Sequence, residues 1–267
     1  MENEYFMLAI RAALAAGNKI IKIYEETETE IEYKEDCSPL TLADLTSNKV
    51  INDHLLSTKI PIISEENQQL DFSIRKKWSK CWIVDPLDGT KEFIKRNGEF
   101  TVNIALVING IPELGVIYAP AMKLMYMGNV SKNIAYKSML SSHNSSLKQV
   151  LDSAVKLQPK YNNKNTIQIA CSRSHMNKNT LDFVEALKAN HKHVELVQIG
   201  SSLKFCLVAE GNVDVYPRFA PTMEWDTAAG QAICNAVGIN VNSDETKQSL
   251  LYNKKNLLNP WFLVSKS

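Results

Sequence analysis

Residues 82–93 read Trp-Ile-Val-Asp-Pro-Leu-Asp-Gly-Thr-Lys-Glu-Phe, and this stretch decides how the rest of the chain is interpreted. Its apolar start predicts a buried strand that stops at Asp85 and Pro86, because proline cannot donate a hydrogen bond to a neighbouring strand. Gly89 lets a ligand approach the backbone closely, and a helix starting beyond it would offer free N–H groups to an anion. The carboxylates of Asp85 and Asp88 would repel that anion unless divalent cations lie between them. The stretch therefore predicts a metal-dependent anion site at the end of a strand.

The composition is that of a globular protein. The chain has 267 residues, 45% hydrophobic and 22% charged, which is enough for one large domain or two small ones. Its net charge of +1 gives no reason to expect a nucleic-acid polymer as a partner. The sequence has no apolar run of about 18 residues that would predict a transmembrane segment, and its start lacks the pattern of a signal peptide. The five cysteines are scattered without a Cys-x-x-Cys pair, which argues against a disulfide framework or a zinc site.

From these features we expect a cytoplasmic protein whose partner is a small molecule. Peripheral association with the inner face of the cell membrane stays open, because no anchor is visible but loose attachment needs none. We expect a monomer or a homodimer.

The first half of the chain reads as helices followed by strands. An amphipathic pattern predicts a helix over 3–26, and Thr41 is typical of the N-cap of a second helix over 42–57. The strands predicted here are 30–33, 61–64, 82–84, 101–108, 113–118 and 123–128, the last three forming an antiparallel meander.

The second half alternates strands with helices, which predicts an α/β layered arrangement. Residues 139–165 are polar with weak periodicity, so we expect a boundary there. The expected N-terminal α+β subdomain, 1–145, would carry most of the metal ligands, and the C-terminal α/β subdomain, 146–267, would complete the site and the substrate pocket. The elements predicted after the boundary are strands at 166–170, 194–199, 213–216, 239–241 and 261–264, and helices at 176–190, 201–210 and 224–236.

Four acids lie at the ends of predicted elements, where sites tend to form, namely Glu65, Asp85, Asp88 and Asp226. Mg²⁺ prefers oxygen ligands and keeps waters for a substrate. A single acid in a loop is more often solvated or capping, and an ordinary turn also explains the pair at 85 and 88. An EF-hand is excluded, because the twelfth position counted from Asp85 is Arg96 rather than Glu. A haloacid-dehalogenase-type phosphatase is disfavoured, because its two aspartates are one residue closer together than these.

Three motifs together resemble the inositol monophosphatase superfamily. They are Asp-Pro-Leu-Asp-Gly-Thr at 85–90, Ser-Glu-Glu at 64–66 and Glu-Trp-Asp at 224–226, and matches run from about residue 34 to the C-terminus. The resemblance implies an alternating αβαβα sandwich of the inositol monophosphatase and sugar phosphatase type. It also implies a Mg²⁺-dependent, lithium-sensitive phosphatase. Ser64 stands where the superfamily often has glycine; since serine is small, we expect little consequence.

Further segments resemble the bacterial 3'(2'),5'-bisphosphate nucleotidases within this superfamily. They are residues 34–44, 172–175, 200–206 and 216–218. The implied reaction is hydrolysis of the 3'-phosphate of adenosine 3',5'-bisphosphate to AMP and phosphate. This reaction removes a by-product of sulfate assimilation.

The resemblance also implies a metal centre and a catalytic group. Two or three Mg²⁺ ions would be held by the side chains of Glu65, Asp85, Asp88 and Asp226 and by the backbone carbonyl of Leu87. The attacking water would be oriented or deprotonated by Asp44 and Glu65, with Thr90 as the partner hydroxyl.

The substrate contacts follow from the same matches. Arg218 and Lys204 suit the second phosphate, Arg as a bidentate partner and Lys as a point charge. Lys204 could instead lie on a solvated helix face, and His175 could cap a helix. Ser201 is predicted to cap the helix over 201–210 and to aim its positive end at a phosphate. The full substrate-binding set is Glu65, Leu87, Asp88, Gly89, Thr90, Ser172, Ser174, His175, Ser201, Lys204, Arg218 and Asp226.

Other functions stay open at this point. An inositol monophosphatase, or a related sugar-phosphate phosphatase such as a fructose-1,6-bisphosphatase, would use the same metal chemistry. An inositol monophosphate carries one phosphate, so it would not need both Lys204 and Arg218. A catalytically silent homologue that binds metal or nucleotide is a third possibility. It is disfavoured because it need not retain the water-activating pair, whereas the full set is intact here: Asp44, Glu65, Asp85, Asp88, Thr90 and Asp226.

Overall fold

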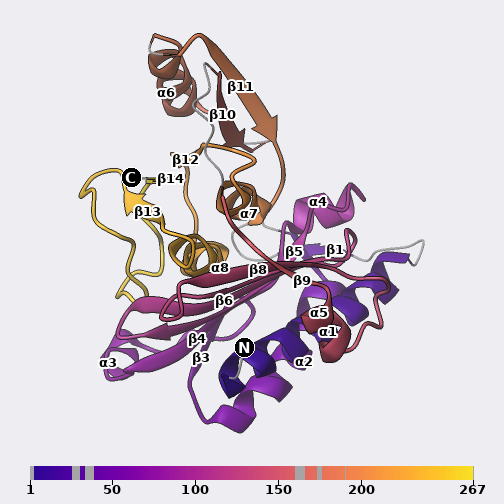
Figure 1. The fold of residues 1–267 in the computed structure, drawn as a ribbon. Coiled ribbons are helices and arrows are strands. Elements are labelled where there is room, and N and C mark those ends of the chain that lie inside the picture. The colour runs from indigo at the N-terminus through magenta and orange to yellow at the C-terminus, as the bar shows by residue number, and fades with distance from the viewer. Residues whose placement is uncertain are drawn as a thin grey trace.

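The computed structural model describes residues 3–25, 31–33, 39–159, 166–172, 176–189 and 191–266. Two sheets alternate with helices in five layers (Figure 1). Helices α1 and α2 cover the outer face of the larger sheet, α7 and α8 lie between the sheets, and α6 covers the outer face of the smaller one. These helices are α1 (Glu4–Glu25), α2 (Leu42–Leu55), α6 (Lys178–Lys188), α7 (Leu203–Glu210) and α8 (Glu224–Asn235). The predicted αβαβα sandwich is confirmed.

The larger sheet has seven strands in the order of the sequence, β3 to β9. Its first pair is parallel and all later pairs are antiparallel, which confirms the predicted meander and extends it. Strands β8 and β9 were not predicted from the sequence, and β9 is short and mostly exposed, so it shows no buried alternation. The strands are β3 (Ile62–Ser64), β4 (Lys80–Asp88), β5 (Thr101–Ile108), β6 (Ile111–Ala119), β7 (Leu124–Asn129), β8 (Ile134–Met139) and β9 (Ala154–Lys156).

The smaller sheet has five strands in the order β11-β10-β12-β14-β13. The first three are parallel and the last two add antiparallel pairs. Its strands are β10 (Thr166–Cys171), β11 (His193–Gln198), β12 (Val215–Arg218), β13 (Ile239–Ser243) and β14 (Phe262–Lys266). The chain thus passes from one sheet to the other between β9 and β10, and the division into subdomains 1–145 and 146–267 stays a proposal.

The remaining elements are short. Strands β1 (Ile31–Tyr33) and β2 (Pro39–Thr41) form an antiparallel pair before α2. Helix α2 is capped by Thr41 as predicted, and a 3₁₀ turn, η1 (Leu56–Thr58), follows its end. Helices α3 (Phe72–Arg75), α4 (Thr90–Ile94) and α5 (Leu147–Asp152) complete the described elements.

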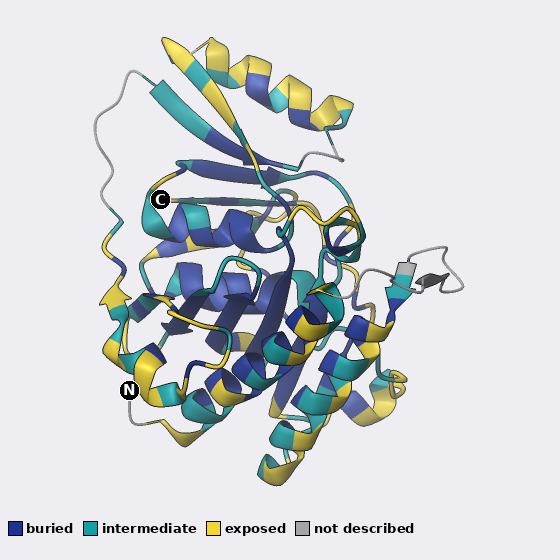
Figure 2. Cartoon of the chain, turned by 90° about the vertical axis from the view of Figure 1, so that its right-hand side faces the viewer, coloured by how far each residue is buried: buried dark blue, intermediate teal, exposed yellow. Residues whose placement is uncertain are grey.

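The larger sheet is apolar on both faces, so its strands separate two hydrophobic layers. In β4, Trp82 and Val84 pack with α1 and α2, whereas Cys81 and Ile83 pack with α7 and α8. Successive side chains of a strand point to opposite faces, so a continuous apolar run fits a sheet that is covered on both sides. Figure 2 shows the result: the central strands are buried and the outer faces of the flanking helices are exposed.

Strand β4 does not stop at Asp85 and Pro86, as the sequence predicted, but continues to Asp88. The register with β5 shifts between Asp85 and Asp88, so the strand contains a bulge there. A bulge leaves residues without a ladder partner, which accommodates a proline that has no N–H. The hydroxyl of Ser47 in α2 donates to the carbonyl of Pro86 at 2.6 Å and holds the bulge in place.

Helix α8 lies almost directly on the backbone of the larger sheet. A Cβ added at Gly115 in β6 would lie 2.3 Å from the carbonyl oxygen of Ala229, and one at Gly128 in β7 would lie 2.7 Å from the Cα of Ile233. Both neighbours are backbone atoms, which cannot swing away as a side chain can. The glycines therefore set the distance between α8 and the sheet.

We expect Gly115→Ala to lower the free energy of unfolding by at least about 1–3 kcal/mol, because the extra methyl group forces α8 off the sheet. Urea unfolding followed by circular dichroism measures this difference. A change of less than about 0.5 kcal/mol would contradict so tight a contact.

Candidate active site

A cavity of about 300 Å³ lies where the ends of strands from both sheets meet the first turns of α4, α7 and α8. Its wall combines polar and apolar groups and includes five carboxylates and three cationic side chains, two of them, Lys204 and Arg218, in α7 and β12. The residues that line it are Glu65, Asp85, Leu87, Asp88, Gly89, Thr90, Lys91, Glu92, Ser172, Ser201, Ser202, Lys204, Phe205, Tyr216, Arg218, Thr222, Asp226 and Thr227.

Most of the site residues predicted from sequence meet in this cavity. Asp44 does not line it but contacts a residue that does, as described below. The predicted residues Ser174 and His175 lie outside the described part of the chain. Those that line the cavity are Glu65, Asp85, Leu87, Asp88, Gly89, Thr90, Ser172, Ser201, Lys204, Arg218 and Asp226.

The bulge of β4 brings its two aspartates to the cavity from one short segment. Asp85 is buried, and its Oδ1 accepts the backbone N–H of Leu87 at 3.1 Å. Asp88 is partly exposed and lies 3.4 Å from the amide nitrogen of Asn103. Gly89 follows with φ of +94°, a conformation that glycine adopts without strain, and ends the strand at the start of α4.

Two further carboxylates reach the cavity from distant parts of the sequence. The backbone N–H of Glu65 bonds to the carbonyl of Val84 at 3.2 Å, so the residue after β3 lies beside the end of β4. Asp226 occupies the first turn of α8, where its Oδ2 accepts the N–H of Met223 at 2.8 Å. This capping bond fixes the carboxylate at the helix N-terminus.

Asp44 lies directly behind the cavity wall. The N–H and the hydroxyl of Thr41 donate to its Oδ2 at 2.8 and 2.6 Å, and the hydroxyl of Thr90 donates to its Oδ1 at 3.1 Å. With its own hydrogen directed at Asp44, the Thr90 hydroxyl keeps a lone pair available toward the cavity. Asp44 and Thr90 are therefore connected in the way that a water-orienting pair requires.

Burial and neighbouring carboxylates raise the pKa values of three aspartates of the cavity. Burial raises the pKa of Asp85 well above its ordinary value, and the charges of Glu65 and Asp88 add to the effect. The pKa of Asp226 is raised by burial and by the Asp88 carboxylate. For Asp88 itself burial raises the pKa, against the opposing charge of Lys204. The ionised cluster thus carries negative charge that the protein does not fully compensate, which a bound cation would relieve.

These residues fit Mg²⁺. Within the described ranges no three carboxylate, histidine or cysteine side chains converge on one point. A magnesium ion does not require three, since it is usually bound by one or two carboxylates and keeps several waters. The four predicted carboxylates and the Leu87 carbonyl are a donor set for more than one such ion.

Two cationic side chains, Lys204 and Arg218, line the same cavity as the carboxylates. Lys204 is buried, and its Nζ donates to the carbonyls of Ile199 and Ser201 at 3.2 and 2.6 Å while lying 5.5 Å from the ring centre of Tyr216. Burial lowers the pKa of Lys204 to about 8, and the Arg218 charge acts in the same direction. The alternative that Lys204 occupies a solvated helix face is therefore wrong.

Arg218, at the end of β12, has an incompletely used guanidinium group. Its Nη2 donates to the carbonyl of Pro221 at 3.1 Å. Its Nε is buried and has no hydrogen-bond partner among the described residues. A buried donor without a partner is costly. Arg218 also lines the cavity, where its guanidinium group is suited to an anionic ligand.

The prediction that Ser201 caps α7 is wrong. Ser202 is the N-cap residue, and Ser201 precedes it with a φ of +44°. The Ser201 hydroxyl donates instead to the carbonyl of Glu99 at 2.6 Å. The Ser202 hydroxyl donates to Oδ1 of Asn103 at 2.7 Å, which joins the start of α7 to β5. Two adjacent serines carry the same propensity for capping, so the sequence could not distinguish them.

Several residues that line the cavity were missed by sequence reasoning. Lys91 and Glu92 directly follow the 85–90 motif, and Tyr216 and Thr222 flank Arg218, so proximity to recognised residues was the available signal. Asn103 gave no signal, because it lies in the middle of an apolar strand.

Comparisons with known proteins agree with this geometry. The chain matches the inositol monophosphatase family over residues 1–261. It is 43% identical over 253 residues to the 3'(2'),5'-bisphosphate nucleotidase CysQ of Shigella flexneri, covering 94% of this chain and 95% of that protein. The CysQ protein of Escherichia coli K12 is 41% identical over the same share of each chain.

Solved structures give the same result for the fold. The crystal structure of CysQ from Bacteroides thetaiotaomicron superimposes with a TM-score of 0.88 and 47% identity, covering 99% of this chain and 98% of that one. Inositol monophosphatase II from Staphylococcus aureus shares the fold alone, with a TM-score of 0.75 and 20% identity over 99% of this chain and 89% of that one. The predicted resemblance is confirmed: the chain belongs to the inositol monophosphatase family.

Proposed function

We propose that this protein is a magnesium-dependent 3'(2'),5'-bisphosphate nucleotidase that hydrolyses the 3'-phosphate of adenosine 3',5'-bisphosphate to AMP and phosphate. The observation that carries the proposal is the pairing of Lys204 and Arg218 in one cavity with the four acids predicted to bind metal. A substrate with two phosphates can place one beside the carboxylates and the other beside the cations. The nucleotidase names of the relatives at 41–43% identity support the same substrate.

We infer that Glu65, Asp85, Asp88 and Asp226, with the carbonyl of Leu87, hold the magnesium ions. Bound there, the ions would offset the charge of the transferred phosphate and make a nearby water more acidic. The acids themselves repel a phosphate, so their part is to hold the cations and leave room for the anion. Gly89 supports this, because a side chain at its position would crowd the carbonyl of Glu99 and the hydroxyl of Ser201, 3.2 Å from its Cβ.

The pair of Thr90 and Asp44 is suited to activating the attacking water. The Thr90 hydroxyl donates to Asp44 and can accept a hydrogen bond from a water on its cavity side. As the water attacks phosphorus, its proton passes to Thr90 Oγ1 while the threonine proton passes to Asp44 Oδ1. Glu65 lines the cavity and orients the same water.

The second phosphate is bound by Lys204 and Arg218. Arg218 lines the cavity with its guanidinium group, and Lys204 adds a charge held in place by two backbone carbonyls. Bonds to a charged partner are roughly twice as strong as neutral ones, so these two side chains favour a bisphosphate over a monophosphate. Ser172, the residue after β10, lines the cavity and would contact the nucleotide; the same role stays a prediction for Ser174 and His175.

The described residues contain no helix long and apolar enough to cross a membrane. A cytoplasmic location, peripheral membrane association and a monomeric or homodimeric state stay predictions.

The deciding assay measures phosphate released from adenosine 3',5'-bisphosphate and from inositol 1-phosphate, with Mg²⁺ and with EDTA. We expect the bisphosphate to be preferred, the nucleotide product to be 5'-AMP by chromatography, and activity to vanish with EDTA and fall with Li⁺. Preference for inositol 1-phosphate would instead support the inositol monophosphatase alternative. Phosphate release that EDTA leaves unchanged would exclude the metal role.

We expect Asp88→Asn to lower turnover by at least about two orders of magnitude, because the site loses a cation ligand. When both proteins are measured without Mg²⁺, the midpoint of thermal unfolding of the variant should equal or exceed that of the wild type, because one repelling charge is removed. Steady-state kinetics and thermal unfolding measure the two effects, and unchanged turnover would refute the ligand role.

Arg218→Ala should raise KM for adenosine 3',5'-bisphosphate by about 10–100-fold, because one charge-assisted contact to the second phosphate is lost. KM for 3'-AMP, which lacks that phosphate, should change little. Arg11→Ala, at an exposed position of α1, is the matched control and should leave both constants unchanged. Equal losses with the two nucleotides would reassign Arg218 to a general structural role.

A further inference from the structure

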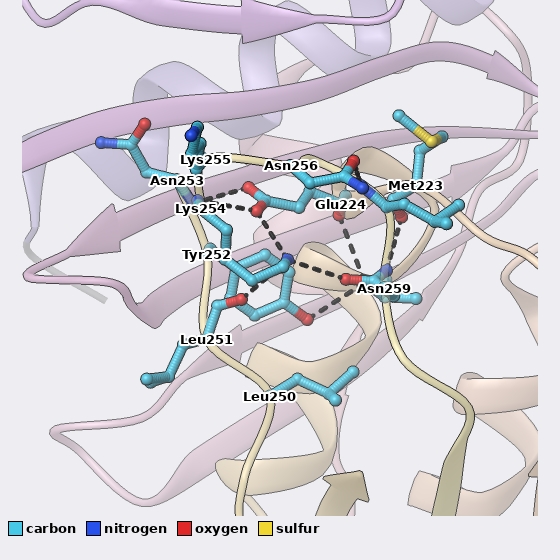
Figure 3. A network of polar contacts seen from close by, with 12 residues as sticks. Met223, Glu224, Leu250, Leu251, Tyr252, Asn253, Lys254, Lys255, Asn256 and Asn259 are labelled. Carbon is cyan, nitrogen blue, oxygen red and sulfur yellow. Dashed lines mark hydrogen bonds and ion pairs between the residues drawn. The ribbon is translucent and has the colours of Figure 1, made fainter. Parts of the chain in front are cut away.

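The first turn of α8 is held by a polar network on the side opposite the cavity (Figure 3). Glu224 and Asp226 are two residues apart, which separates their side chains by roughly 200° around a helix. Asp226 faces the cavity, whereas the carboxylate of Glu224 is fully buried against the segment 250–259. Glu224 does not line the cavity and has no access to a substrate.

Lys254 joins the parts of this network. Its Nζ donates to Oε1 of Glu224 at 2.6 Å, to Oδ1 of Asn259 at 3.2 Å and to the carbonyl of Leu251 at 3.1 Å. The backbone N–H groups of Asn253 and Lys254 donate to the same Glu224 carboxylate, at 2.6 and 3.0 Å. Figure 3 shows the Lys254 side chain linked to the Glu224 carboxylate and to the Asn259 side chain.

Asn259 completes the connection to the turn that carries Asp226. Its Nδ2 donates to the carbonyl of Met223 at 2.7 Å and to the hydroxyl of Thr227 at 2.9 Å. Met223 is the residue whose backbone N–H donates to the Asp226 carboxylate. The polar contacts therefore run from Lys254 through Asn259 and Met223 to Asp226, while Glu224 fixes the same turn from within the helix.

We propose that Lys254, through Glu224 and Asn259, is a positioning residue that sets the orientation of the Asp226 carboxylate for the cation. The proposal rests on the proposed function insofar as it takes Asp226 to be a magnesium ligand. Outer groups that orient a metal ligand typically contribute a factor of about 10–100 to metal affinity or activity. Lys254 is suited to this role because it neutralises the buried Glu224 and contacts Asn259 at the same time.

The test is calorimetric titration of Mg²⁺ into the whole protein without substrate, so it does not depend on which phosphate ester is hydrolysed. Lys254→Met keeps the aliphatic part of the side chain and removes the charge. We expect Mg²⁺ affinity to fall at least about tenfold at a temperature where circular dichroism shows the variant folded. Lys254→Arg, which keeps a cation and its donors, is expected to bind within about threefold of the wild type.

Lys247→Met is the matched control. It removes another lysine–carboxylate pair of the C-terminal region, Lys247–Asp244 at 2.8 Å, which is solvent-exposed and belongs to the turn after β13. Its Mg²⁺ affinity should not change. A network that only supported the fold would alter the unfolding midpoint of Lys254→Met and leave its Mg²⁺ affinity intact.

If Lys254→Met leaves Glu224 unpaired and does not fold, the double variant Glu224→Gln/Lys254→Met decides the question, because it buries no lone charge. Mg²⁺ binding within about twofold of the wild type in either folded variant overturns the proposal. A wild type that binds Mg²⁺ but does not hydrolyse the bisphosphate would refute the proposed function and leave this inference standing.

Discussion

The structure depends on keeping several carboxylates close together where burial makes their charges costly. Asp85, Asp88, Asp226 and Glu65 repel one another, and no chain would gather them unless their backbones were fixed by other forces. Each acid is accordingly held by rigid surroundings: a bulged strand buried on both faces, the end of a parallel strand pair, or a capped helix turn. The hydrophobic layers on either side of the larger sheet oppose the repulsion.

The same principle explains why both sheets contribute to one cavity. Negative charge comes mainly from the larger sheet, while Lys204 comes from α7 and Arg218 from β12 of the smaller sheet. The carboxylates and these two cations serve the two requirements of the proposed substrate, a phosphate that is cleaved and a phosphate that is held. The hydrogen bond from Ser202 to Asn103 joins the start of α7 to β5 of the larger sheet.

The sequence predicted the layered fold and most of the cavity, because its strongest signals are local. Three of these signals specify a conformation within a few residues: the apolar run before Asp85, the capping pair Thr41 and Asp44, and the glycine at 89. What it could not predict depends on contacts between distant residues. The continuation of β4 through Pro86 requires a hydroxyl from α2, and the orientation of Ser201 is set by a carbonyl of the segment before β5. The short strand β9 exists because β8 is beside it, and its own composition gives no sign of it.

The close seating of α8 on Gly115 and Gly128 has a consequence for how the protein is made. The seven strands that form the larger sheet all precede residue 157, so they can pair while the ribosome is still translating the rest. The apolar face that α8 covers then stays open to water until residue 235 has left the exit tunnel. Nascent chains in this interval expose a large apolar surface. A chaperone that binds apolar surfaces during translation would recognise them.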